Sequence, residues 1–118
     1  MDSILTSIKK LLGITEEYEQ FDMDIIIHIN SVLSILTDLG VGPEQGYSIF
    51  SKEAKWVDYI PDTTNVNIET VKTYIYLKVK LIFDPPSSSS VVASMERMIQ
   101  ELEWRINMNA EKYQKGVM

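Results

Sequence analysis

Apolar side chains recur at helical spacing in four stretches of the chain. Because residues three and four positions apart lie on one face of a helix, this pattern predicts an all-α fold with four main helices. Their expected bounds are about 3–12, 22–39, 67–83 and 90–110. Gly13, Gly40–Pro43 and Asp84–Pro86 follow the first three and are expected to end them. The expected N-caps are Asp2 or Ser3 for the first helix, Asp22 for the second, Asn67 for the third and one serine of residues 87–90 for the fourth.

The second stretch is apolar around most of its circumference. Ile25, Ile29, Val32 and Leu36 form the stripe, and further isoleucines and leucines widen it. The β-branched residues at 25–29 also allow a strand, although the length and spacing favour a helix. Such a helix must be covered on most sides, either by the other helices of a monomeric bundle or by a second subunit.

The connection between the second and third helices is long and irregular. It covers residues 43–66 and has room for a short helix over about 53–60, capped by Ser51, with Trp56 on its apolar side. A connection of this length inside a compact domain is often functional. We expect one helical domain over residues 1–112. A flexible tail over residues 113–118 should follow, because these residues are mostly polar and include a glycine.

Charge and composition exclude several function classes. The 118 residues carry a net charge of −6, and residues 14–40 contain six acids with no Lys or Arg. No basic cluster indicates direct binding to nucleic acid. The absence of cysteine excludes disulfides and thiolate metal sites and fits a reducing cytoplasm. No apolar run has the roughly 18 residues that a membrane span needs, and the N-terminus lacks the order of a signal peptide.

Candidate catalytic chemistry is limited to Asp24 and His28, one helical turn apart. An Asp–His pair can orient a general base or supply two metal ligands, but no third group accompanies it. We therefore interpret His28 as a half-exposed helical histidine beside a carboxylate. The acidic residues 16–24 lack the pattern of a calcium-binding loop. The sequence predicts a protein that is not an enzyme, with no catalytic residue, cofactor or metal.

Interaction chemistry is better supported, chiefly on the last helix. If Leu102 faces the core, Trp104 lies about 200° away, with Arg97 and Met108 near it. Trp, Met and Arg are enriched in protein interfaces. Trp104 either covers residues 43–66 of its own chain or contacts another chain, and we favour the second. Lys78 lies on the apolar side of the third helix, where it either reaches to water or pairs with the acidic residues 16–24 of a neighbour.

Several motifs together resemble a known family. The long second helix ends in Leu-Gly-Val-Gly-Pro43, and Trp-Val-Asp-Tyr-Ile60, the block Lys72–Pro86 and Leu-Glu-Trp-Arg105 follow in order. This arrangement resembles the small head–tail connector (adaptor) proteins of long-tailed bacteriophages and prophages of Gram-positive bacteria. The resemblance covers about residues 4–110 and rests on packing and turn motifs.

The resemblance implies a non-catalytic structural subunit of the virion neck, made in the host cytoplasm. Family members assemble as a ring, typically a dodecamer, beneath the portal protein and extend the DNA channel. Their partners are further copies, the portal, and stopper or tail-completion proteins, while DNA only passes through and no membrane is involved. Contacts would come from the Trp104 side of the last helix, from Trp56 and Tyr59 in residues 43–66, and from Tyr113 near the C-terminus. The alternatives are a host helical interaction or regulatory module and a small enzyme using Asp24 and His28.

Overall fold

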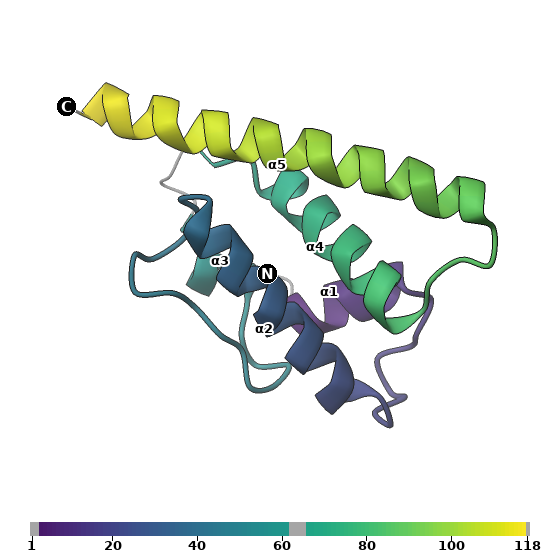
Figure 1. Cartoon of the computed structure of the whole chain (residues 1–118). Helices are drawn as coiled ribbons and strands as arrows, with labels where there is room; N and C mark the ends of the chain where they lie inside the picture. The colour runs from purple at the N-terminus through teal and green to yellow at the C-terminus, as the bar shows by residue number, and fades with distance from the viewer. Residues whose placement is uncertain (1–2, 62–65, 118) are drawn as a thin grey trace.

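Helices make up the fold, as the apolar spacing predicts. A computed structural model describes residues 3–61 and 66–117, with side chains as far as Asn109. Within these residues the helices are α1 (Ile4–Leu11), α2 (Asp22–Asp38), α3 (Trp56–Tyr59), α4 (Ile68–Phe83) and α5 (Ser89–Val117), shown in Figure 1. The described part contains no strand, only an isolated bridge between Ser3 and Lys55. The predicted all-α bundle is confirmed.

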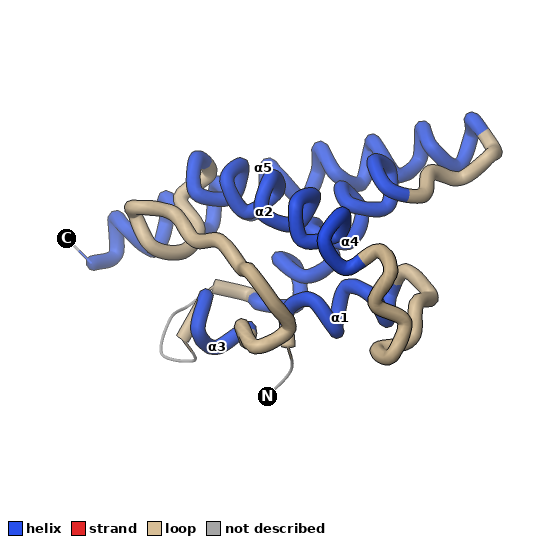
Figure 2. Tube along the Cα trace, turned by 90° about the horizontal axis from the view of Figure 1, so that it is seen from below, coloured by secondary structure: helices blue, strands red, loops and turns tan. Residues whose placement is uncertain are grey.

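Helix α4 is the centre of the bundle. It packs against α1, α2 and α5, and the apolar side of α2 lies in the same core. Helix α5 runs across one side of the molecule, at the top of Figure 1, and its C-terminal end projects past the other helices in Figures 1 and 2. The molecule is elongated and flat, with extents of 45 × 35 × 21 Å. The stripe of α2 is thus covered within the chain, on its inner side.

Two predicted caps form as expected. The Ser3 hydroxyl accepts a hydrogen bond from the backbone N–H of Thr6 (3.2 Å). The Asn67 side chain accepts hydrogen bonds from the N–H groups of Glu69 and Thr70. Each bond satisfies a donor that the start of a helix leaves free.

The predicted cap at Asp22 is wrong. Asp22 is the first residue of α2, and Phe21 occupies the cap position without a side-chain hydrogen bond. The Asp22 carboxylate instead forms an ion pair with the Lys9 ammonium at 2.7 Å. A buried cation attracts the carboxylate more strongly than exposed backbone N–H groups do, so it takes Asp22 away from the cap.

Lys9 ties the first connection to α1. Its side chain is only 2% exposed, and Nζ donates hydrogen bonds to the carbonyl oxygens of Glu16 (3.0 Å) and Tyr18 (2.8 Å). With the Asp22 ion pair, the ammonium therefore has three oxygen partners. A buried charge needs such a set of partners to offset its lost hydration.

The described part of the long connection is fixed to the helices. The Asn30 side-chain amide donates to the Ile49 carbonyl (2.9 Å) and accepts from the Ile49 N–H (2.8 Å). Further along, the Ile4 N–H donates to the Ala54 carbonyl (3.0 Å), and Trp56 Nε1 donates to the Ser7 hydroxyl (3.0 Å). These bonds join residues 49–56 to α2 and α1.

The short helix expected over about 53–60 is α3, Trp56–Tyr59. Ser51 does not cap it, since its hydroxyl accepts from the nearby Glu53 N–H. The Asp58 carboxylate accepts from the Lys55 N–H (2.9 Å) and closes the first turn instead.

Helix α5 differs from its prediction in length. It continues to Val117, so the expected end near residue 110 is wrong, because residues 110–115 contain no helix-breaking residue. The flexibility expected for residues 113–118 stays a prediction. Ile99 and Ile106 are buried, whereas Val91 and Met98 are about half exposed. At the start of α5, the Ser88 hydroxyl accepts from the Val91 N–H (3.4 Å), which agrees with a serine cap.

Candidate interaction surfaces

The outward side of α5 exposes the residues that the sequence analysis placed there as interface candidates. Trp104 is 65% exposed and Met108 is 44% exposed, and Arg97 is also exposed. Glu101 and Arg105 form an ion pair one turn apart, at 3.3 Å. We call these five residues the Trp104 face. Because Trp104 is 65% exposed, packing against residues of its own chain leaves most of its side chain accessible.

Polar contacts on the inner side of α5 set this orientation. The Tyr74 hydroxyl of α4 donates to the Glu103 carboxylate (2.7 Å), and the Asn107 amide donates to the Leu39 carbonyl at the end of α2 (3.3 Å). Burial, followed by the hydrogen bond and the charge of Glu103, raises the pKa of Tyr74, so the phenol stays protonated as a donor. The buried residues Ile99 and Ile106 lie about 140° and 160° around the helix from Trp104, so Trp104 faces outward.

Lys78 lies in a groove of about 520 Å³ between α4 and α5. Its neighbours in the groove are Leu81, Ile82, Glu96, Ile99, Gln100 and Glu103. Lys78 as a residue is partly buried, and its ammonium forms no ion pair within the described residues. The groove borders the Trp104 face, since Gln100 is one turn from Trp104 on α5. The pairing of Lys78 with a neighbouring chain remains a hypothesis.

Trp56 and Tyr59 lie in the core rather than on the surface. Trp56 is 5% exposed, with the Lys72 ammonium 5.3 Å from its ring centroid. Tyr59 is 1% exposed and its ring centroid lies 5.1 Å from that of Tyr47. Both residues hold the long connection in place, so we leave them out of the candidate interface. Tyr113 is in α5, and its side chain lies outside the described residues.

A second exposed surface was missed by the sequence reasoning. The ring centroid of Phe21 lies 5.7 Å from that of Tyr18 and 5.4 Å from that of Phe83. Elsewhere on the first turns of α2, Met23 and Ile27 are 67% and 58% exposed, on the side of the helix away from its buried stripe. We call these five residues the aromatic end. The four-residue spacing of Met23 and Ile27, opposite the buried stripe, was a signal in the sequence, but nothing in it pairs Phe21 with Phe83.

The Asp24 and His28 side chains do not form a catalytic pair. The His28 ring packs near Phe83, with centroids 6.4 Å apart, and no hydrogen bond joins it to Asp24 within the described part. Over the same residues, no three His, Asp or Glu side chains come together as a metal site. The arrangement around His28 is one of packing.

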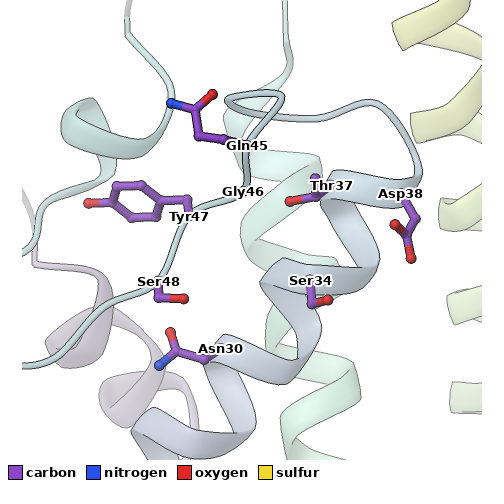
Figure 3. A pocket seen from close by; sticks show the side chains of 8 residues that line it. All are labelled: Asn30, Ser34, Thr37, Asp38, Gln45, Gly46, Tyr47 and Ser48. Carbon is purple, nitrogen blue, oxygen red and sulfur yellow. The ribbon is translucent and has the colours of Figure 1, made fainter.

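A polar hollow of about 360 Å³ lies between α2 and the long connection. Figure 3 shows Asn30, Ser34 and Thr37 along α2, facing the segment that carries Gln45 and Ser48. Asp38 and Tyr47 are the ionisable groups of the lining, and burial, with a smaller effect of the Asp58 carboxylate, raises the pKa of Tyr47. The Asn30 amide is already bonded to Ile49. The lining offers hydrogen-bonding groups and lacks a nucleophile paired with a base.

Together the fold and surfaces define a small helical protein that exposes aromatic and methionine side chains. No described helix combines the length and hydropathy that crossing a membrane requires. A family model described as phage connector protein matches residues 4–113, and the chain belongs to this family. Comparison with curated proteins and with solved structures gave no match.

The family confirms the resemblance drawn from the sequence motifs. It supports a role in the phage head–tail connector, among the proteins of the virion. The expected Gram-positive host stays a prediction.

Proposed function

We propose that this chain is a non-catalytic subunit of the connector ring in the phage neck. Copies of it assemble, as a dodecamer in our expectation, beneath the portal protein. The ring extends the DNA channel and offers a docking surface to stopper or tail-completion proteins. DNA passes through without being held. The observation that carries the proposal is the family match over residues 4–113.

The exposed surfaces support this role. The Trp104 face and the aromatic end expose aromatic and methionine side chains on a chain whose core is otherwise well covered. Clusters of this kind mark interaction sites. The projecting end of α5 adds a surface that can reach a partner beyond the body of the subunit (Figure 1). The net charge of −6 disfavours adhesion to the DNA backbone.

Binding to the portal tests the proposal. The chain is mixed with purified portal rings encoded beside it, and the particles are separated by sedimentation and imaged by electron microscopy. We expect an added ring on one end of the portal. A chain that stays unbound at all concentrations would overturn the proposal, whereas a monomer in solution without portal would not, because assembly can require the template.

The variant Trp104→Ala tests the proposed surface. We expect portal-bound ring assembly to weaken at least about tenfold, since a central interface tryptophan typically contributes 2 kcal/mol or more. The free energy of unfolding should change by less than about 0.5 kcal/mol, because the side chain is 65% exposed. Val91→Ala is the matched control, as Val91 is 46% exposed near the opposite end of α5. Equal assembly by the two variants would remove Trp104 from the interface.

A further inference from the structure

The aromatic end combines exposed rings with an acidic border. Tyr18 and Phe21 are 45% and 37% exposed, and Met23 is 67% exposed. Four exposed acids accompany them on residues 16–24: Glu16, Glu17, Glu19 and Asp24. Asp22 is not among these, because Lys9 neutralises it. An apolar surface with this border fits a partner that is aromatic and basic.

The Trp104 face has this complementary chemistry. Arg97 bonds only to the neutral Ser94 hydroxyl (3.1 Å) and has no acidic partner in the described part. Arg105 is paired with Glu101, but Lys78, in the groove beside this face, is a second cation with no ion pair in the described part. Trp104 and Met108 supply the aromatic ring and the thioether that pack well against Tyr and Phe rings.

The two surfaces lie apart on one molecule. In Figure 1, α5 crosses the top, whereas the start of α2 and the connection before it lie at the bottom. One chain therefore cannot join its own two surfaces. A symmetric pairing of two aromatic ends would also bring four acids against four acids, which is repulsive.

We infer that the aromatic end of one copy binds the Trp104 face of the next. This contact is heterologous, so each copy uses both surfaces and the chain of contacts either closes into a ring or continues as a filament. The inference rests on the proposed function and assigns the subunit–subunit contact within it. Lys78, in the groove beside the Trp104 face, lies where acids of the incoming copy would approach.

Cysteine cross-linking tests the contact without background, because the natural chain has no cysteine. One variant carries Met23→Cys and the other Met108→Cys, and the two are mixed at high concentration, with and without portal rings, under oxidising conditions. We expect the mixed disulfide dimer as the main cross-linked product, with little dimer from either variant alone. The matched control replaces Met23→Cys by Phe50→Cys, whose position is more open, at 84% exposed, and should give only traces.

Each other outcome contradicts the inference. Dimers formed by either variant alone would show a symmetric contact. A cross-link of equal yield with Phe50→Cys would show random collision. If the chain binds portal rings but forms no Met23–Met108 link, the proposed function stands and this contact is wrong. If it neither binds portal nor cross-links, both fail.

Exchange of charge gives a second readout. Asp24→Lys and Arg97→Glu should each reduce ring assembly several-fold, because each places like charges at the contact. The double variant should recover most of the loss. A double variant no better than the singles would contradict the pairing of these surfaces.

Discussion

Tyr59 places a phenol hydroxyl in the core without a hydrogen-bond partner among the described residues. Leaving such a group unpaired costs about 1–3 kcal/mol, so Tyr59→Phe should be neutral or stabilise the fold by about 1 kcal/mol at pH 7. Urea unfolding measures the difference. Tyr74→Phe is the control, because its hydroxyl donates to Glu103 and its loss should destabilise by about 1 kcal/mol. A Tyr59→Phe variant that is clearly less stable would reveal a hidden partner.

The buried phenol of Tyr59 should also lower the free energy of unfolding at alkaline pH. Burial raises the pKa of Tyr59 above its ordinary value of 10.0. The unfolded chain then loses this proton from about pH 10 upward while the folded chain retains it. The contribution of Tyr59 to stability is therefore complete below pH 10. Above pH 10 the loss of this contribution should lower the free energy of unfolding by about 1.4 kcal/mol per pH unit. Tyr59→Phe should show a shallower decline between pH 10 and 11.

Gly42 is required where the chain turns beside Tyr59. Its φ is +81°, and an added Cβ would lie 2.6 Å from Tyr59 Cε1. Gly42→Ala should cost about 2–4 kcal/mol, from backbone strain and the displaced ring. Gly13→Ala separates these effects, because its φ is +84° with no atom within 4 Å, and should cost only about 1 kcal/mol. Equal losses of unfolding free energy in Gly42→Ala and Gly13→Ala would mean that the contact with Tyr59 adds nothing to the cost of backbone strain.

At the scale of elements, Lys9 joins α1, the first connection and α2. Lys9→Met keeps the side-chain length but leaves the Asp22 carboxylate and two carbonyl groups without their cation. We expect a loss of about 3 kcal/mol of unfolding free energy, measured by urea denaturation. Lys10→Met is the control, as Lys10 is exposed on the same helix and should change stability by less than about 0.5 kcal/mol. A small loss of unfolding free energy in Lys9→Met would mean that Lys9 stabilises the fold mainly through the packing of its aliphatic chain rather than through its charge.

The elements could be predicted because their signals are local. The apolar spacing within each helix, the stops at Gly13 and Pro85, and the caps at Ser3 and Asn67 involve neighbouring residues. What could not be predicted joins distant residues. The clamp of Asn30 on Ile49 spans 19 positions, and the contact of Phe21 with Phe83 joins the start of α2 to the end of α4.

For the surfaces, too, local signals could be predicted and contacts between distant residues could not. The outward position of Trp104 was predictable, because helical geometry alone fixes it relative to Leu102. The burial of Tyr59 was not, since it depends on how the long connection folds back over the helices.

At the scale of the whole molecule, Lys78 offers a test of assembly that leaves the fold in place. If it pairs with acids of a neighbouring copy, Lys78→Gln should weaken portal-bound assembly and reduce its dependence on salt. Lys80→Gln is the control, since Lys80 already pairs with Asp84 on the same helix at 3.0 Å. Sedimentation over a range of salt concentrations measures both. Identical salt dependence for Lys78→Gln and the natural chain would end this hypothesis.

The bond between Trp56 and Ser7 also has a consequence for biosynthesis. Its two residues are 49 positions apart, and a ribosome adding 5–20 residues per second needs about 2 to 10 seconds to make the second after the first. Ala54, which binds the N–H of Ile4, arrives in the same interval. Helix α1 is therefore made first, and its bonds to residues 54–56 can form only after that interval, later than the bonds of Lys9 to residues 16–22.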